Sequence, residues 1–517
     1  MTVNSTSLAA GNFVGVKNVQ FQPIAEVLKR KILLIGTKDP LKTTLAADTP
    51  VQVLSPEDVA DKAGFGSMLH RLAIKSFAGS QGVETWIIPQ DEESGAEAAV
   101  GTITLTDSAG VLAGTLYMYI AGDLIEVAIT KEMTPTGIGD AIVAAVTADT
   151  SMPVTAVSDT GVVTVTAKTK GTFGNFIDIS FNWGVGQELP TGVTAVVVSM
   201  ASGASDPDID DALNSLGTGD DANEAYFTDM IHGYGPITAT LDKVSVYNGI
   251  GNAFTGCYSK EIARPFRSLN GDTVADSAGL TALIAFGGGR KSDRTSGTIG
   301  VPGSPNHPAE IASLALSYAA YLNNGRAEET STGSLLSGII PGVKADRWTS
   351  DYDNRDLAVS AGISTSEIKS GAVYVGNLVT YYHPDNVPSS SNGYRSMRNI
   401  SILQNILNSF KLNFAQEKWT GITIVNDVTR VGNTNSRQKA RDIETVKDDL
   451  VSLALAYEGN AWIYTASYTI EQLRESSAVT VRTLTNGFDT IFKILLSGEG
   501  GILNSEIQFD TSISVLL

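Results

Sequence analysis

The pattern of apolar and polar positions predicts an α/β domain at the start of the chain. Residues 21–90 contain two short apolar runs of buried-strand type, Lys31–Gly36 and Val83–Ile88. Between them a helical pattern covers Ser67–Ala78, and a shorter helix begins at Pro56, which suits a first helical position. A strand, helices and a second strand in this order predict a βαβ unit, and therefore a parallel sheet.

From residue 91 to residue 205 the pattern changes to short alternating strands. Only one helix is predicted there, around Ile138–Ala148. This segment is therefore expected to be an inserted, mainly-β domain with its own core. Its predicted strands are Thr102–Thr106, Thr115–Ile120, Leu124–Ile129, Val162–Ala167, Phe176–Phe181 and Ala195–Ser199.

The α/β pattern resumes over residues 206–393. Asp206 is expected to cap a helix whose first residue is Pro207. Thr281–Phe286 (TALIAF) is predicted to be a buried strand, because it is a short apolar run. Together with residues 21–90, this segment is predicted to form one central α/β domain. Further predicted elements are the helix Pro308–Leu322 and the strand Val373–Tyr381.

Residues 394–510 are predicted to form an α+β domain, and both chain ends are predicted to be arms. Two helical patterns are followed by strands at Ala478–Leu484 and Phe488–Leu495. In residues 511–517 polar and apolar residues alternate, and the segment ends in consecutive aliphatic residues. Such a segment needs a partner strand. Residues 1–20 are predicted to be an extended arm, with a frayed terminus as the alternative. The strand-forming arm residues are Phe13, Val14, Val16, Val19, Ile513, Val515 and Leu516.

Charge is distributed unevenly along the 517 residues, whose formal net charge is −19. Residues 91–230 carry 21 acidic and 3 basic side chains, a net charge of −18. This segment would repel nucleic acid and anionic membranes, so we expect a solvated outer domain. The only cysteine, Cys257, excludes an intrachain disulfide and fits a reducing cytoplasm. We expect no secretory signal and no membrane insertion, since the apolar runs are short.

Motifs for catalysis, metals or nucleotides are not found. The nucleophile elbow G-x-S-x-G is absent, and Ser67 is better explained as a helix cap. Gly287–Lys291 does not match the phosphate-loop spacing, and Asp206–Asp211 does not match a calcium loop. Arg290, Lys291 and Arg294 form either a solvated loop or a contact with an acidic neighbour. We therefore expect no enzyme activity, cofactor or metal. The four histidines, none at metal-ligand spacing, are His70, His232, His307 and His383.

Several motifs, in this order and spacing, resemble one family over nearly the full chain. They are Phe65–Leu69 with Glu84–Pro89, Ala113–Gly122, Lys170-Gly171 with Gly174-Asn175, and Val373–Pro384 with Tyr394-Arg395. The chain is similar to the tail sheath proteins of contractile phages, specifically the Mu-like branch.

The resemblance implies a subtilisin-like central sheath domain, to which no catalysis is carried over because no triad motif is present. It implies an outward insertion, and a C-terminal domain that faces the tail tube. The terminal arms would add strands to the C-terminal sheet of a neighbouring copy. The implied function is a helical sheath that contracts to drive the tube through the host envelope. The implied partners are copies of the chain, the tube, and the baseplate and terminator proteins, with no direct nucleic acid. The implied location is the virion tail, assembled in the bacterial cytoplasm.

Two other functions stay open at this point. A secreted serine-hydrolase-like enzyme with a β accessory domain would need a signal segment and a nucleophile elbow. Another helical tail component, such as a tube protein, is expected to be much smaller than this chain.

Overall fold

The chain forms two compact units, each described here by itself. The computed structural model describes residues 27–107, 110–217, 226–249, 265–274, 276–348, 352–383, 392–482 and 486–498. The central unit comprises the described residues from Val27 to Asn408, and the C-terminal unit those from Ser409 onward.

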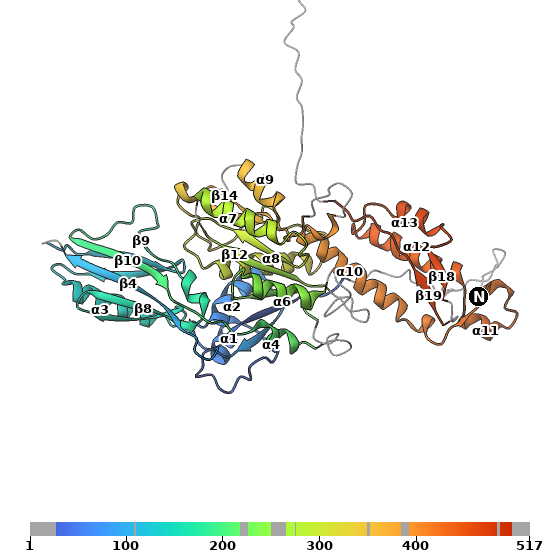
Figure 1. The fold of residues 1–517 in the computed structure, drawn as a ribbon, viewed down its shortest axis with the longest axis horizontal. Helices are drawn as coiled ribbons and strands as arrows, with labels where there is room; N and C mark the ends of the chain where they lie inside the picture. Colours follow the sequence, from blue (N-terminus) through green and yellow to red (C-terminus); the bar gives the residue numbers. More distant parts are fainter. Residues whose placement is uncertain are drawn as a thin grey trace, which may run out of the picture. The chain divides into compact units, whose positions relative to one another are not determined.

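An eight-stranded sheet forms the middle of the central unit (Figure 1). Six strands are parallel, and one antiparallel strand closes each edge. The predicted βαβ unit is confirmed, because β1 and β3 are parallel neighbours. In spatial order the strands are β15 (Ala372–Asn377), β14 (Ser364–Lys369), β13 (Ser296–Gly300), β12 (Arg267–Asp272), β11 (Asp229–His232), β1 (Lys31–Thr37), β3 (Glu84–Gln90) and β2 (Val51–Val53).

Helices cover both faces of this sheet. Gly36 on β1 and Gly271 on β12 leave space for the helices that contain Met68 and Pro308, since a Cβ there would collide with those residues. Buried aliphatic side chains on both faces make the sheet the core of the unit. One face carries α1 (Pro56–Ala63), α2 (Met68–Gly79) and α8 (Pro308–Asn323); the other carries α4 (Ile209–Asn214), α6 (Thr238–Asn248), α7 (Asp276–Gly289) and α9 (Tyr352–Ser360).

The predicted strand Thr281–Phe286 is wrong, because these residues lie in helix α7. Leu280 and Leu283 are buried at helical spacing, and Ile284 is half-buried beside them. A short apolar run does not distinguish a strand from one face of a buried helix.

The predicted cap Asp206 is also wrong, because α4 begins two residues later. Asp208 is the cap, and its carboxylate accepts a hydrogen bond from the Asp210 amide at 2.9 Å. Asp206 accepts from the Thr172 amide at 2.7 Å instead, which joins the residue after the insertion to the 3-10 turn Thr172–Phe176 inside it.

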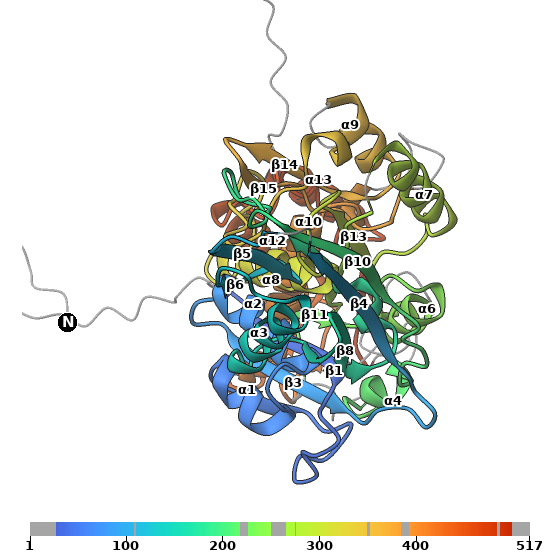
Figure 2. The same cartoon turned by 90° about the vertical axis from the view of Figure 1, so that its left-hand side faces the viewer.

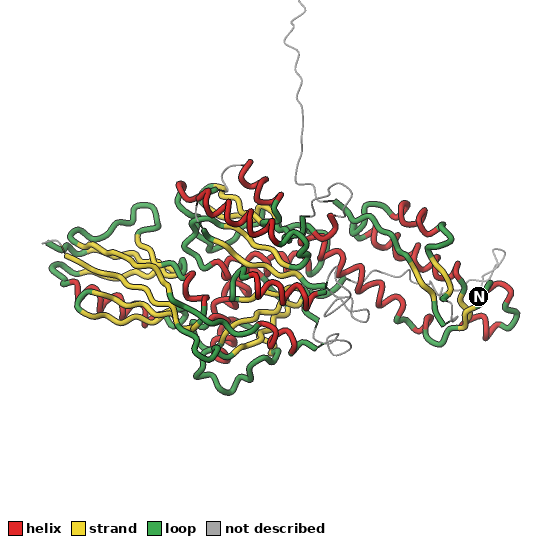
Figure 3. Tube along the Cα trace, viewed as in Figure 1, coloured by secondary structure: helices red, strands yellow, loops and turns green. Residues whose placement is uncertain are grey.

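The insertion contains two antiparallel sheets around one apolar core (Figure 3). Its chain enters and leaves at one bridge, where Glu97 and Ala204 exchange backbone hydrogen bonds of 3.1 and 3.2 Å. Strand β7 (Val154–Asp159) was not among the predicted strands. One sheet has the order β10 (Val193–Ala201), β4 (Ala98–Asp107), β8 (Val162–Lys170), β7; the other β6 (Asp123–Ile129), β5 (Gly114–Ile120), β9 (Ile179–Phe181), with helix α3 (Pro135–Ala148) packed beside them (Figure 2).

Half-buried aromatic side chains form a cluster in the C-terminal unit. Phe410, Phe414 and Trp419 lie with ring centroids about 5 Å apart, and Phe492 packs between Phe410 and Tyr457. Helix α10 (Met397–Phe414) begins in the central unit and continues into this one. The other elements are α11 (Thr434–Lys439), α12 (Ile443–Gly459), α13 (Ala466–Leu473), β16 (Thr423–Ile424), β17 (Ala440–Arg441), β18 (Val479–Val481) and β19 (Phe488–Thr490).

Short 3-10 turns complete the described elements: Thr172–Phe176, Lys344–Asp346, Asn392–Tyr394, Glu417–Trp419 and Val428–Arg430. Within the described ranges, every helix is too short or too polar to span a bilayer.

Candidate assembly site

The predicted arm residues lie outside the part of the chain that the structure describes. These are Phe13, Val14, Val16, Val19, Ile513, Val515 and Leu516. Their pairing with another copy stays a prediction.

A two-stranded sheet in the C-terminal unit offers open edges to an added strand. β18 and β19 pair antiparallel, with Val479 opposite Thr490 and Val481 opposite Phe488. Among the described residues, this sheet has no third strand. A two-stranded sheet is marginal in water, and its outer edges carry main-chain groups that can bind another strand.

Exposed apolar side chains lie in the same unit as this sheet. The Ile491 amide, directly after β19, donates to the Ala478 carbonyl at 2.8 Å. The Tyr464 amide donates to the Leu495 carbonyl at 2.7 Å, which extends the strand-like pairing. The exposed fractions are 55% for Ile491, 72% for Tyr464 and 47% for Leu495. An added aliphatic strand could bury these side chains.

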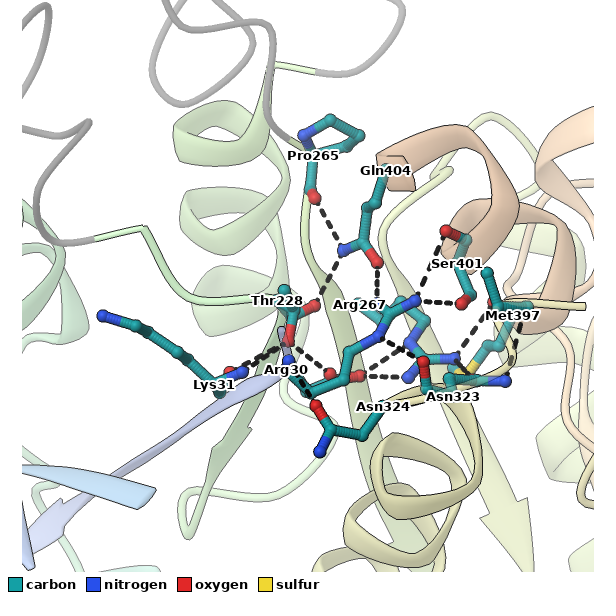
Figure 4. Close-up of polar contacts among 12 residues, drawn as sticks. Arg30, Lys31, Thr228, Pro265, Arg267, Asn323, Asn324, Met397, Ser401 and Gln404 are labelled. Carbon is teal, nitrogen blue, oxygen red and sulfur yellow. Dashed lines mark hydrogen bonds and ion pairs between the residues drawn. The ribbon is translucent and has the colours of Figure 1, made fainter. Parts of the chain in front are cut away.

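A buried polar junction joins the start of the central unit to helix α10 (Figure 4). Arg30, just before β1, donates to the Gln404 side chain and to the Ser401 hydroxyl. Its Nε donates to the Asn323 carbonyl at 3.4 Å, at the end of α8. The Leu28 amide donates to the α10 residue Asn405 at 2.8 Å. The entering chain is therefore fixed to α8 and α10 before it reaches the sheet.

A second buried arginine joins α10 to the sheet itself. Arg267 on β12 donates from Nε to the Asp229 carboxylate on β11 at 2.6 Å. Its Nη1 donates to Asn323 Oδ1 at 2.8 Å and to the Met397 carbonyl, at the start of α10, at 3.2 Å. Arg267 is 1% exposed and Asp229 is fully buried, so the pair is shielded from water.

Among the described residues, the junction holds two arginines and one carboxylate. Burial and the nearby charge of Arg267 lower the pKa of Arg30 to about 10, while Asp229 acts in the opposite direction. Arg30 donates only to neutral acceptors, namely Gln404, Ser401 and the last-turn carbonyl of Asn323. Helix C-termini favour cations, which helps hold this charge inside the protein.

Ser401, Gln404 and Asn405 lie at i, i+3 and i+4 along α10, and all three are buried. The helical pattern predicted within residues 394–510 does not by itself indicate this junction. A polar stripe at helical spacing was the signal that could have indicated it.

An ionic contact fixes the insertion to the central unit. Arg71 on α2 forms two hydrogen bonds to Glu310 on α8, at 2.7 and 3.0 Å. Its Nη1 lies 2.6 Å from Asp123, the first residue of β6 in the insertion. Glu310 is fully buried, and burial raises its pKa while Arg71 lowers it.

His307 forms a second contact between these two parts. Its Nδ1 accepts from the Ala309 amide at 3.2 Å, so Nε2 carries the proton and donates to the Phe173 carbonyl at 2.9 Å. The rings of His307 and Phe173 also stack, with their centroids 3.9 Å apart. Burial lowers the pKa of His307 to about 3, so the ring stays neutral near pH 7.

The residues considered for chemistry have structural roles. Ser67 caps α2, as predicted, by accepting from the His70 amide at 3.3 Å. Of the two predictions for the basic cluster, a solvated loop is wrong for Arg290. This side chain is buried and bonds to Asp242 and Asp293 of its own chain, each at 2.8 Å.

Arg294 of the same cluster lies over the rings of Tyr382 and Tyr394, about 5 Å from each centroid. His383 bonds locally to the Tyr381 carbonyl. Across the described ranges no group of three or more His, Cys, Asp or Glu could hold a metal, and Cys257 lies outside them.

Comparison with known proteins finds a relative in sequence. No protein-family model matches the chain. Over 414 residues the chain is 25% identical to the Mu-like prophage FluMu tail sheath protein of Haemophilus influenzae, which covers 78% of each sequence.

Two solved structures were also matched. The sheath tail protein of Desulfitobacterium hafniense is 11% identical, with a TM-score of 0.44, over 95% of this chain and 98% of that one. The contracted sheath complex of an extracellular contractile injection system is 8% identical, with a TM-score of 0.45, over 98% and 99%.

Proposed function

We propose that this relative of the Mu-like tail sheath proteins is the structural subunit of a contractile tail sheath. The observation that carries the proposal is the 25% identity over 414 residues to a Mu-like prophage tail sheath protein, because it extends over 78% of both chains. That match confirms the family resemblance of the sequence motifs. The chain works by assembly and not by catalysis.

The sheath would be a helix of copies around a tail tube, and would contract to drive the tube through a host envelope. Contacts between two different surfaces of identical copies build open helices, because such contacts need not close. The further partners are the tube, baseplate and terminator proteins, and the location is a virion tail assembled in the bacterial cytoplasm. Nucleic acid is not a direct partner, and no part inserts into a membrane.

Within the sheath we assign a role to each part of the chain. The central domain, residues 21–90 and 206–393, would be the subtilisin-like sheath domain. The insertion, residues 91–205, would face outward, and residues 394–510 would face the tube. Copies would stay connected through residues 1–20 and 511–517, which add strands to the C-terminal sheet of a neighbour.

The open edges of β18 and β19 support this linkage, since they offer main-chain groups to an added strand. Contraction would rotate rigid subunits into a state with more buried surface between them. The energy would come from that surface and not from a nucleotide.

Electron microscopy of truncated variants tests the proposal. The purified full chain is expected to form hollow cylinders in negative stain. Variants that lack residues 1–20 or 511–517 are expected to keep their fold by circular dichroism and to stay monomeric. A full chain that stays monomeric and cleaves generic peptides would overturn the function. Truncated variants that polymerise normally would overturn the arm linkage alone.

A further inference from the structure

One segment of the C-terminal unit is basic in a chain that is otherwise acidic. Residues 415–441, here called the basic lobe, contain 5 basic and 2 acidic side chains, against a net charge of −19 for the whole chain. They include the 3-10 turns Glu417–Trp419 and Val428–Arg430, β16, α11 and β17.

The basic lobe has almost no core of its own. From residue 414 to residue 439 no side chain is buried. Its helix α11 has six residues, and its two strands have two residues each. Segments with few buried apolar contacts have low local stability, and a binding partner can supply the missing contacts.

Three cations of the lobe are held by carbonyl groups and have no carboxylate partner within the described ranges. Arg437 donates to the carbonyls of Val428 and Thr429, at 3.2 and 2.9 Å. Lys439 donates to the Thr420 carbonyl at 3.2 Å.

Arg441 is the third of these cations. It donates to the Lys418 carbonyl at 2.6 Å, and its guanidinium lies 5.6 Å from the Trp419 ring centroid. Carbonyl oxygens orient these side chains without cancelling their charge, so the lobe is prepared for an anionic partner.

A matching acidic surface lies on the central unit of the same chain. Gln90, at the end of β3, donates to the Asp48 carboxylate at 3.1 Å and to the Asp208 carbonyl at 2.7 Å, which brings these segments together. Burial raises the pKa of Asp48, and the charges of Asp211 and Asp91 raise it further. Asp91 and Glu93 line one surface hollow together with Ala47, the residue before Asp48. We call the following set the acidic rim: Asp48, Asp91, Glu93, Asp208, Asp210 and Asp211.

Only part of the rim is neutralised within its own chain. Lys243 lies 2.6 Å from Asp208 and 3.5 Å from Asp210, and Lys38 lies 2.6 Å from Asp91. Asp211 and Glu93 are exposed, and neither forms an ion pair among the described residues.

We propose that the basic lobe of one copy docks on the acidic rim of a second copy. This contact joins two different surfaces, so it propagates a chain of copies and does not close a dimer. It rests on the proposed function in one respect, that copies of this protein assemble. Complementary charge gives such a contact its register and speeds the encounter of copies.

Charge reversal tests the contact. One variant carries Arg437→Glu and Lys439→Glu; the other carries Glu93→Lys and Asp211→Lys. Each alone is expected to lower the fraction of protein that sediments as polymer at least tenfold, at about 0.1 M salt. An equal mixture, and one chain with all four changes, are expected to restore polymer, because each lobe then meets a rim of opposite charge.

A matched control reverses two exposed cations that lie outside the lobe and outside the β18–β19 sheet, Lys131→Glu and Arg474→Glu, and is expected to polymerise like the wild type. Circular dichroism checks that every variant folds. Wild-type polymerisation is expected to weaken as salt rises, a readout that needs no variant.

The outcomes separate the two proposals. Wild-type protein that never polymerises would overturn the sheath function. Wild-type polymer that is insensitive to both salt and reversal would overturn the docking contact alone. Restoration in the four-fold variant but not in the mixture would place the contact within one chain and also overturn docking between copies.

Discussion

At the scale of single residues, the central unit depends on buried charges that are matched unevenly. Arg267 is paired with Asp229, whereas Arg30 has only neutral acceptors. Breaking a buried ion pair costs more than the pair contributes, because the remaining charge has no water around it. The junction is therefore sensitive to truncation of either partner.

Arg267→Met should lower the free energy of unfolding by about 3–5 kcal/mol, because Asp229 would be left buried and unpaired. Arg326→Met is the control, since Arg326 is 68% exposed beside Glu329 and its loss should cost about 1 kcal/mol or less. Urea unfolding followed by circular dichroism measures both. Equal losses in the two variants would contradict the role given to the buried pair.

His232 should make the fold sensitive to acid. Burial lowers its pKa to about 4, below the value of about 6.5 in the unfolded chain. The unfolded chain therefore takes up a proton first, so this contribution to stability is complete above about pH 6.5 and is lost as pH falls toward 4.

His232→Leu should reduce this acid sensitivity, by roughly 2 kcal/mol at pH 5 relative to its effect at pH 8. Unfolding midpoints of both proteins across this range measure the difference. The comparison at pH 8 is the internal control, since neither state of the ring takes up a proton there. Parallel pH curves for the two proteins would show that His232 does not contribute.

At the scale of elements, the sequence predicts best where packing follows a simple period. The helix Pro308–Leu322 and the strand Lys31–Gly36 match α8 and β1 closely, because their apolar positions match their burial. The strands β12 and β13 were not predicted, since RSLNGD and SGTIG are polar or small. Their side chains are buried by pairing with distant residues, as Arg267 is with Asp229. Pairing between residues that are distant in the sequence leaves no periodic apolar pattern within the strand, so the sequence does not reveal it.

Asp442 caps α12 and also holds the basic lobe. Its carboxylate accepts from the Thr445 amide and from the Val428 amide, each at 2.8 Å. Asp442→Ala should lower stability by about 0.5–2 kcal/mol and speed amide hydrogen exchange at both Thr445 and Val428.

Asp427→Ala is the control for this change, because Asp427 caps only the short turn Val428–Arg430. Its effect on exchange should stay within that turn. Unchanged exchange at Thr445 in Asp442→Ala would contradict the double role of Asp442.

At the scale of the whole molecule, the chain enters and leaves the insertion at the bridge between Glu97 and Ala204. Replacing residues 98–203 by an Asn-Gly turn should leave the central sheet folded, because that turn suits an antiparallel bridge. The thermal midpoint should fall, since Arg71 and His307 lose their partners in the insertion. Differential scanning calorimetry and circular dichroism measure these outcomes.

Asp123→Ala in the full chain is the comparison, because it removes the contact with Arg71 and keeps the insertion. Loss of the circular dichroism signal of the folded central unit after excision would mean that this unit needs the insertion in order to fold.

The surface position of the basic lobe also has a consequence for proteolysis. Trypsin cleaves after lysine and arginine, and the 5 basic residues of the lobe lie in a stretch with almost no buried side chains. A free subunit should be nicked there before its sheets are cleaved, whereas a docked lobe would be shielded. The rate of that first cleavage should therefore fall as the fraction of subunits in polymer rises.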